Sequence, residues 1–298
     1  MARPIAFDLR DRVVLITGGA RGIGLDAGRR LTARGAQVAV LDVDGDAAAR
    51  AASAIGERAA DFAVDVTDRD ALAAAVEAVL ARFGQIDAVV ANAGVAPPTG
   101  TILGVDAGAW ERVVEVNLHG VYRTVKATLP HVVARRGHVL VIASVYAMSN
   151  GAMASPYAVS KAAVEALGRA LRVELAPYGA TAGVAYFGFI DTQLVRDAYA
   201  DPVAAQLRTL LPKWIAKPLP VGRAGAAIVR GLERRAARVM VPRYVPALAA
   251  VRGLLPVTVD LQLARDARVH RAIGECDARA VPPPPAAPAA APSISREA

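Results

Sequence analysis

The sequence has a single cysteine, few lysines and no long uninterrupted hydrophobic run. Cys276 stands alone among 298 residues, which excludes an internal disulfide framework and is compatible with a reducing compartment. The longest uncharged run, residues 139–160, is interrupted by serine, asparagine and proline, so it is a poor candidate for a membrane span. The N-terminal residues lack the charged-then-apolar layout of a signal peptide. We therefore expect a soluble, cytoplasmic protein.

Positive charge is abundant but unevenly distributed. The formal net charge is +8, and residues 208–279 contain 14 Arg or Lys against 5 Asp or Glu, a local net charge of +9. A basic region of this kind can attract nucleic acid, anionic lipid or an acidic partner, although most such regions are solvated faces. Lysine accounts for four of the 35 basic residues, so each lysine position is worth inspecting.

Short apolar runs alternate with helical patterns along most of the chain. The predicted strands are residues 12–17, 36–42, 61–66, 86–94, 137–144, 180–187 and 238–242, and the predicted helices include 23–34, 69–83 and 118–136. This alternation is typical of parallel β-α-β units with helices on both faces of a sheet. The predicted fold class is therefore α/β, a single doubly wound Rossmann-type domain with about seven parallel strands, which binds ligands at the carboxyl ends of its strands.

Three segments are predicted from the pattern and the composition. Residues 1–242 form the Rossmann-type domain, residues 243–280 an amphipathic helical extension, and residues 281–298 a disordered Pro/Ala-rich tail with too little apolar bulk to fold. The extension is consistent with a cover over the substrate entrance, a contact with a neighbouring subunit or a peripheral membrane contact. A helix packed on its own domain is an equally good interpretation.

A glycine-rich stretch, TGGARGIG at residues 17–24, follows the first strand and opens a helix. Glycine lets the backbone turn tightly and approach a pyrophosphate, which the free N–H groups of the helix start stabilise. A purely structural turn is the alternative. The next strand ends in Asp42, a position suited to hydrogen bonds with an adenosine ribose, or alternatively to a helix cap or a turn. Together they predict a dinucleotide site whose loop includes Gly18, Arg21, Gly22, Ile23 and Gly24.

Two charged residues of this predicted site bear on the choice of dinucleotide. The Asp42 carboxylate would repel a 2′-phosphate, which favours NAD. Arg21 argues the other way, because a guanidinium in the phosphate loop can pair with a 2′-phosphate. We predict NAD, with NADP the less favoured cofactor, since the repulsion at Asp42 is the more direct effect.

One of the rare lysines lies four residues after a tyrosine, in the stretch SPYAVSK. Tyr157 and Lys161 are expected on one helical face, within reach of each other. A cation beside a phenol favours the phenolate, so the pair can form an acid/base group usable nearer neutral pH. An ordinary surface pair is the alternative.

Taken together, these motifs resemble those of the short-chain dehydrogenase/reductase family, over roughly residues 10–242. The family's TGxxxGxG motif matches Thr17 to Gly24, its NAG motif matches Asn92, Ala93 and Gly94, and its YxxxK motif matches Tyr157 to Lys161. Its catalytic serine and asparagine match Ser144 and Asn117. The order and number of the matches make the resemblance specific.

The resemblance implies an NAD(P)-dependent oxidoreductase acting on CH–OH groups. Tyr157 would exchange a proton with the substrate while hydride moves to or from the nicotinamide. Lys161 would hold the nicotinamide ribose and lower the pKa of Tyr157, aided by the oxidised ring. Ser144 would bind the reacting oxygen, and Asn117 would hold a water that links Lys161 to solvent. Taken singly, Ser144 could instead satisfy backbone at a strand end, and Asn117 could cap a helix or turn.

Further cofactor contacts follow from the resemblance. Asp65 and Val66 match the position beside the adenine, although Asp65 could instead cap the helix that begins near residue 68. Ile190 and Thr192 match the segment that contacts the nicotinamide carboxamide. The chain departs from the family at Phe187, where a proline usually precedes the glycine, and in its C-terminal ending.

The residues expected to face the substrate are mostly apolar or aromatic. They are Val145, Tyr146, Met148, Asn150, Met153, Phe187 and Phe189. Such residues suit a hydrophobic secondary alcohol or ketone, for example a steroid, terpenoid or lipid, although the same residue types often form cores. The NAD-favouring site suggests oxidation as the cellular direction. We predict no metal site.

Other functions and partners are weighed against this prediction. A ketoreductase for acyl-thioester or carrier-bound substrates would use the basic region to meet an acidic carrier. A non-catalytic dinucleotide-binding scaffold is disfavoured by the complete set of catalytic residues. Nucleic-acid binding is not expected, because no recognised motif accompanies the basic region. We expect a homodimer or homotetramer built on the helices at about residues 118–136 and 157–177.

Overall fold

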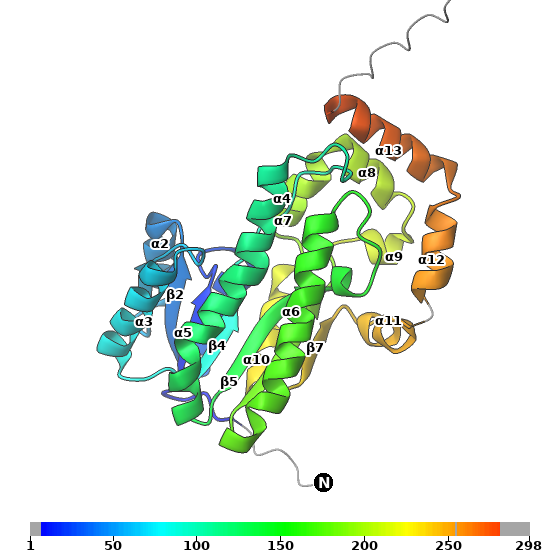
Figure 1. Ribbon diagram of the computed structural model, residues 1–298. Helices are drawn as coiled ribbons and strands as arrows, with labels where there is room; N and C mark the ends of the chain where they lie inside the picture. The colour runs from blue at the N-terminus through cyan, green and yellow to red at the C-terminus, as the bar shows by residue number, and fades with distance from the viewer. Residues whose placement is uncertain (1–6, 254, 281–298) are drawn as a thin grey trace, which may run out of the picture.

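Seven parallel strands form one sheet in the computed structural model, which describes residues 7–253 and 255–280 (Figure 1). The strands are β1 (Val13–Thr17), β2 (Gln37–Asp42), β3 (Ala59–Ala63), β4 (Ala88–Ala91), β5 (His138–Ser144), β6 (Thr181–Phe187) and β7 (Arg238–Val241). Their order in the sheet is β3-β2-β1-β4-β5-β6-β7. The predicted doubly wound α/β fold is therefore confirmed.

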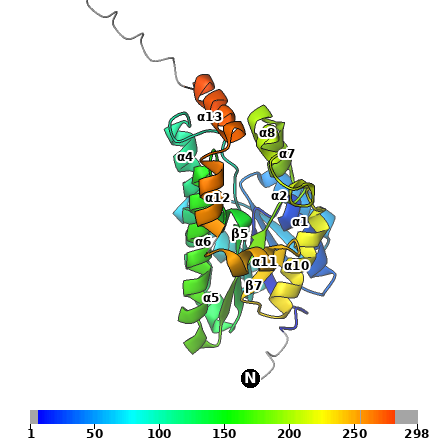
Figure 2. The same cartoon turned by 90° about the vertical axis from the view of Figure 1, so that its right-hand side faces the viewer.

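A layer of helices covers each face of the sheet, as Figure 2 shows edge-on. The helices α1 (Gly22–Thr32), α2 (Gly45–Ile55) and α10 (Val221–Glu233) pack on one face, and α3 (Arg69–Phe83), α5 (Val121–Ala134) and α6 (Ser155–Glu174) pack on the other. Side chains alternate along each strand, so Val13 and Leu15 join one core while Val14 and Ile16 join the other. Burial on both faces explains why the strands read as continuous apolar runs.

Several element boundaries differ from the sequence prediction. The third strand ends at Ala63 rather than at residue 66, because its pairing with β2 ends with Asp42 opposite Ala63. The fourth strand ends at Ala91, so the NAG motif lies in a loop. A π-helical turn, η1 (Glu115–Gly120), precedes α5 where a regular helix was expected. The helix predicted over residues 69–83 is confirmed.

The strand order places a ligand crevice between β1 and β4. From β1 the chain continues to β2 on one side, whereas β4 lies on the other side and leads to β5. The loops that leave the carboxyl ends of these two strands therefore diverge, and ligands of doubly wound sheets bind in the crevice between them. The glycine-rich stretch follows β1, and the NAG motif follows β4.

The chain after β6 builds helices around the carboxyl end of the sheet (Figure 1). Between β6 and α10 lie α7 (Gln193–Ala200), α8 (Pro202–Arg208) and α9 (Lys213–Ala216), and after β7 lie α11 (Val245–Val251), α12 (Leu255–Leu263) and α13 (Ala267–Ala280). The helix α13 packs on α8, and Cys276 and Ala272 on α13 are buried in a cluster with Met153 and Val203.

The predicted helical extension thus packs on its own domain, near the carboxyl ends of the strands. Side chains of its helices contact three segments that follow different strands. Asp277 accepts a hydrogen bond from Thr101 after β4, Asp260 accepts one from Asn150 after β5, and Arg279 forms an ion pair with Asp201 after β6. The tail predicted at residues 281–298 lies outside the described residues. Across residues 7–253 and 255–280, no helix combines the length and apolar character that crossing a membrane requires. The cytoplasmic location stays a prediction.

Candidate active site

A cavity of about 1400 Å³ opens at the carboxyl ends of β1, β2, β4, β5 and β6. It brings together most of the residues that the sequence analysis assigned to the cofactor and to catalysis. The predicted cofactor residues on its wall are Gly18, Arg21, Gly22, Ile23, Asp42, Asp65, Val66, Asn92, Ala93, Gly94, Ile190 and Thr192, joined by Ser144, Tyr157 and Lys161. The cavity is larger than a typical pocket for one small ligand, so it has room for a dinucleotide beside a substrate.

The glycine-rich loop fits against the NAG loop with backbone in direct contact. The Asn92 side chain donates to the carbonyls of Thr17 and Gly18, at 3.0 and 2.9 Å. Gly18 has a φ of +61°, and a Cβ there would lie 2.9 Å from the Cα of Ala93. A Cβ at Gly24 would lie 2.5 Å from the Gly18 carbonyl oxygen, so Gly24 lies behind the wall rather than on it. The loop therefore needs glycine for close approach, beyond what an ordinary turn requires.

Asp42 faces the cavity at the end of β2. Its carboxylate accepts from the backbone N–H groups of Ala20, at 3.1 Å, and Asp44, at 3.2 Å. The cap of α2 is Asp44, whose side chain accepts from the N–H of Ala47, so Asp42 does not cap that helix. Its bond with the N–H two residues on is that of a turn residue, so the turn alternative is confirmed and the ribose contact stays a prediction. Asp44 also pairs with Arg21, at 2.6 Å between Nη2 and Oδ2. The guanidinium that argued for NADP is therefore engaged by a second carboxylate.

Asp65 lies on the cavity wall beyond the end of β3. It accepts from the backbone and hydroxyl of Thr67, at 2.9 and 2.8 Å, and pairs with Arg112 at 3.2 Å. Burial raises the pKa of Asp65, but these hydrogen bonds and the Arg112 charge outweigh it and hold the pKa below its usual value. The cap of α3 is Asp68, so the capping alternative for Asp65 is wrong. Arg112 also lines the cavity, and no motif in the sequence pointed to it.

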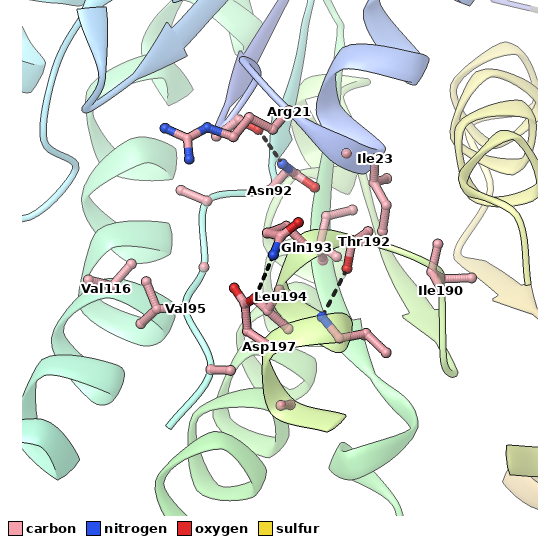
Figure 3. Close-up of a pocket in the computed structure, with 18 of the residues that line it drawn as sticks. Arg21, Ile23, Asn92, Val95, Val116, Ile190, Thr192, Gln193, Leu194 and Asp197 are labelled. Atoms are coloured by element: carbon pink, nitrogen blue, oxygen red, sulfur yellow. Dashed lines mark hydrogen bonds between the residues drawn. The ribbon is translucent and has the colours of Figure 1, made fainter. Parts of the chain in front are cut away.

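The segment after β6 closes one side of the cavity (Figure 3). Ile190 pairs with Leu219 in an isolated bridge, and Thr192 caps α7 by accepting from the N–H of Val195, at 3.4 Å. A Cβ at Gly22 would lie 3.3 Å from the methyl group of Thr192, so this segment touches the glycine-rich loop. Gln193, Leu194 and Asp197 also line the cavity and were missed in the sequence, because nothing in their spacing marks them.

Tyr157 and Lys161 meet in the first turns of α6, as their spacing predicted. The Lys161 Nζ lies 5.5 Å from the centroid of the Tyr157 ring and donates to the Ile142 carbonyl, at 2.9 Å. Lys161 is 4% exposed, so the alternative of an ordinary surface pair is wrong. A buried ammonium with a backbone partner at the wall of a cavity is typical of a functional lysine.

Burial shifts the pKa values of both residues of this pair. Burial raises the pKa of Tyr157 to about 12, while the hydrogen bond with Ser144 lowers it and the Tyr146 hydroxyl raises it further. Burial also lowers the pKa of Lys161 to about 8. The prediction that Lys161 lowers the pKa of Tyr157, aided by the oxidised nicotinamide ring, concerns the complex with cofactor and stays a prediction. In the protein alone the Lys161 ammonium is directed to the Ile142 carbonyl.

Ser144 ends β5 and lies beside Tyr157. Its hydroxyl donates to the Phe187 carbonyl, at 3.2 Å, and accepts from the backbone N–H of Tyr146, at 3.3 Å. A further hydrogen bond joins it to the Tyr157 side chain. Ser144 thus hydrogen-bonds backbone groups at a strand end, which was the alternative to a catalytic role. It also contacts Tyr157, which a catalytic role requires.

Asn117 lies buried behind the cavity, in the π-helical turn η1. Its Oδ1 accepts from the backbone N–H of Val95, at 2.8 Å, and its Nδ2 donates to the Val95 carbonyl, at 3.0 Å. Single π-helical turns occur often at functional sites, where they redirect one side chain. The asparagine therefore fixes the loop after β4, and its role in holding a water stays a prediction.

The residues predicted to face the substrate are scattered. Phe187 lines the cavity, whereas the other six do not. Val145 and Met148 belong to the hydrophobic core, Met153 packs on Cys276, and Asn150 donates to Asp260 on α12, at 3.0 Å. Tyr146 packs edge-on against Tyr157, and Phe189 packs on Tyr199. The helical extension contacts the segment after β5 through these bonds of Asn150 and Met153, and no sequence pattern predicted that contact. The substrate role of the seven residues stays a prediction.

Comparisons with known proteins agree with this geometry. The family described as short chain dehydrogenase matches residues 12–202. The chain is 36% identical to a cis-4-hydroxycyclohexanecarboxylate dehydrogenase of Sinomonas cyclohexanicum, over 72% of this chain and 87% of the relative. It is 34% identical to an L-fucose dehydrogenase of Bos taurus, over 72% and 78% of the two chains. The solved structure of a 3-ketoacyl-(acyl-carrier-protein) reductase from Brucella melitensis complexed with NADH has a TM-score of 0.69 and 27% identity, over 78% and 97% of the two chains.

Proposed function

This chain belongs to the short-chain dehydrogenase family, and on that premise we propose that it is an NAD-dependent enzyme that interconverts a hydrophobic secondary alcohol and its ketone. The observation that carries the proposal is the gathering of Ser144, Tyr157 and Lys161 on the wall of one cavity, beside the glycine-rich loop. A tyrosine, a serine and a lysine next to a dinucleotide cradle suit proton exchange at an alcohol carbon. The names of the two dehydrogenases above agree with this reaction class.

The residues present fit a dinucleotide. Gly18 lies backbone to backbone against Ala93, so no side chain fills the space in front of α1. The N–H groups at the start of α1, which no side chain caps, can bind a pyrophosphate there. Asp42 faces the place expected for a ribose. NAD is favoured over NADP because Asp42 and Asp44 are two carboxylates beside this place. Arg21, the candidate partner of a 2′-phosphate, is already paired with Asp44.

The chain's own residues would divide the chemistry as follows. During oxidation Tyr157 would act as a phenolate, which the Lys161 charge and the oxidised nicotinamide ring would favour, and take the proton of the substrate hydroxyl; during reduction the phenol would return that proton. Ser144 holds the same oxygen, since its hydroxyl is bonded to Tyr157. Lys161, whose pKa lies near 8, exchanges protons in the neutral range and can pass them onward from the tyrosine. The nicotinamide, when bound, supplies the hydride acceptor or donor.

Initial rates of the wild type and of Tyr157→Phe test the proposal, with NAD and NADP in parallel and a panel of hydrophobic secondary alcohols that includes hydroxysteroids. We expect wild-type turnover with NAD and a loss of about 10²- to 10⁴-fold in kcat for the variant, because general acid-base catalysis contributes that much. NADH affinity, measured by fluorescence, should change little. Tyr178→Phe, at a tyrosine that is 60% exposed, serves as the control. Full activity of Tyr157→Phe would contradict the proposal.

A second candidate is a ketoreductase for carrier-bound substrates. The name of the Brucella melitensis protein supports it, as does the basic region over residues 208–279, whose charge complements an acidic carrier. Turnover of a ketoacyl group on its carrier, without turnover of the free ketone, would select this function. Binding of NADH without turnover of any substrate would instead support the non-catalytic scaffold.

We further propose that the chain forms a homo-oligomer through the outer faces of α5 and α6. Tyr122 on α5 and Val159 and Val173 on α6 are large apolar side chains at 48%, 50% and 75% exposure. Apolar side chains gathered on neighbouring helices suit burial against a second copy. Sedimentation of the wild type should give at least a dimer, and Val159→Lys combined with Val173→Lys should shift it toward monomer. A monomeric wild type would overturn this proposal.

A further inference from the structure

Two wall segments of the cavity bury little apolar surface of their own. The first wall segment, residues 95–101, follows the NAG motif, contains neither helix nor strand and lines the cavity as far as Thr99. The second wall segment, residues 193–208, forms α7 and α8 and lines the cavity as far as Asp201. None of the α7 residues is buried, and Val203 is the buried residue of α8. Segments of this kind open easily, so contacts from elsewhere must fix their positions.

The helix α13 holds the end of the first wall segment at two places. The Asp277 carboxylate on α13 accepts a hydrogen bond from the Thr101 hydroxyl. The backbone N–H of Gly100 donates to the Met153 carbonyl, at 3.1 Å. The Cys276 thiol on α13 in turn lies 3.9 Å from the Met153 sulfur. The first wall segment is therefore fixed to α13 directly and through one intermediate residue.

The same helix holds the second wall segment. Arg279 on α13 forms an ion pair with the cavity-lining Asp201, at 3.3 Å. The Asp201 side chain also caps α8, where it accepts from the N–H of Val203 at 2.8 Å. Val203 is buried in an apolar cluster to which α13 contributes Ala272 and Cys276. The buried residue of the second wall segment thus owes its burial in large part to α13.

A single helix therefore ties together two wall segments that follow different strands, β4 and β6. Figure 2 shows α13 between α8 and α4 (Ala107–Val114), the helix that follows the first wall segment. We propose that α13 is a strap that fixes the separation of the two wall segments and thereby determines how bulky a substrate the site accepts. Asp277 and Arg279 are its positioning residues. This inference rests on the proposed oxidoreductase function.

The strap favours a compact ring alcohol over a bulky one. Wall segments held at a fixed separation keep apolar contact with a compact ligand and clash with a bulkier one. If the strap is released, the wall segments can move apart, since they bury little apolar surface of their own. The compact ligand then loses contact and the bulky ligand gains space.

Two matched double variants and a pair of alcohols test the inference. Arg279→Met with Asp277→Ala releases both polar contacts of the strap, whereas Arg279→Lys with Asp277→Asn keeps a cation and a hydrogen-bond acceptor. The alcohols are cyclohexanol and 4-cyclohexylcyclohexanol. In the releasing variant, kcat/KM for the bulky alcohol relative to the compact one should rise about tenfold, because a pocket discriminates size by contact and clash. The conservative variant should keep the wild-type ratio, and so should Arg268→Met, which removes an exposed pair with Asp266.

The ratio of the two alcohols separates this role from a merely structural one. A general loss of stability lowers the rates with both alcohols and leaves their ratio as in the wild type. An unchanged ratio in the releasing variant, with an active wild type, would overturn the inference and leave the proposed function intact. A releasing variant inactive on both alcohols would assign α13 to the integrity of the site rather than to substrate size, and would also overturn it.

Amide hydrogen exchange covers the case without turnover. In the releasing variant, the backbone amides of both wall segments should exchange about tenfold faster than in the wild type, while those of β1 and β5 should not change. Faster exchange in both wall segments would support the strap even if the wild type turned over neither alcohol, and the proposed function alone would then fail. Exchange that is unchanged, or faster in one wall segment only, would contradict a strap that ties the two together.

Discussion

The two sides of the cavity are built in different ways. On the side that follows β1, β2 and β4, backbone meets backbone: a Cβ at Gly24 would lie 2.5 Å from the Gly18 carbonyl oxygen, and one at Gly18 would lie 2.9 Å from the Ala93 Cα. On the side that follows β6 and β7, the elements behind the cavity wall are held by side-chain contacts, such as Tyr199 on Phe189 and Tyr244 on Trp214.

This difference explains why sequence motifs predict the residues of one side and not those of the other. Where two backbones approach closely, only glycine fits, so the sequence shows a glycine motif at fixed spacing. Packing between side chains can be achieved by many combinations of residues of suitable size, so it produces no recognisable motif in the sequence. The first side therefore suits a cofactor shared by a family, and the second suits a substrate that differs between members.

The largest effect is expected from Gly24→Ala on the backbone-built side. The added methyl group has no space against the Gly18 carbonyl, so the loop must move, and NADH affinity should fall about a hundredfold or the free energy of unfolding should drop by about 1–3 kcal/mol. Gly274→Ala is the control, because a Cβ there meets nothing within 4 Å and α13 should gain stability slightly. Isothermal titration and urea unfolding measure both. If the two variants had equal NADH affinity and equal free energy of unfolding, the proposed need for close backbone contact at Gly24 would be contradicted.

Lys161→Met tests a charge that is buried between the two sides, on α6 beside β5. Burial lowers the pKa of Lys161 to about 8, so below pH 8 the folded protein holds a disfavoured charge. The unfolded chain keeps this proton up to about pH 10.4, so wild-type stability should rise relative to the variant between pH 8 and that value. The variant should thus be the more stable at pH 7, by on the order of 2–3 kcal/mol apart from packing changes.

Lys126→Met, at an exposed lysine of α5, is the control for this pH trend. Its unfolding free energy should follow the wild type from pH 7 to pH 10. If Lys161→Met followed the wild type equally closely, the burial of a charged lysine would be contradicted.

Asp42→Asn should change the choice of cofactor. The amide keeps an oxygen for the N–H groups of Ala20 and Asp44 but removes the charge that opposes a 2′-phosphate. The ratio of kcat/KM for NAD to that for NADP should fall about tenfold to a hundredfold, since like charges in contact cost several kcal/mol. Asp46→Asn, at an exposed carboxylate in the first turn of α2, should leave the ratio unchanged. A ratio unaffected by Asp42→Asn would assign cofactor choice to other residues.

The smallest effect is expected on the side-chain-built side, from Arg252→Met. Arg252, at the end of α11, pairs with Glu165 on α6, a carboxylate whose side chain is 7% exposed. Its loss should lower the free energy of unfolding by about 1–2 kcal/mol, because the buried Glu165 carboxylate loses its nearest cation but keeps Arg169 at 3.8 Å and a hydrogen bond with Tyr186. Arg268→Met removes an exposed pair with Asp266 and should change stability by less than about 1 kcal/mol. Unfolding in guanidinium chloride measures the stability of both variants. If Arg252→Met left the free energy of unfolding unchanged, the Arg252–Glu165 pair would not contribute to holding the extension.

Sequence reasoning predicted most of the residues that gather on the cavity wall after β1, β2 and β4. The strand pattern, the glycine-rich loop, Asp42 and the Tyr157–Lys161 pair were all found where their spacing placed them. It erred on element boundaries, since the third strand ends at Ala63 and the fourth at Ala91. Spacing also did not reveal the burial that raises the pKa of Tyr157 in the protein alone, or the contact of Met153 with α13.

By itself the sequence determined the fold class and the order of the motifs. The fold class depends on local hydrophobic periodicity, and the glycine-rich motif depends on glycines where backbones touch, so neighbouring residues carry both signals. The tertiary structure alone decided that Arg21 is engaged by Asp44, that Arg112 pairs with Asp65, and that the extension packs over the loops after three strands. Those contacts join residues far apart in the chain, and their partners are fixed only once the sheet has brought the segments together.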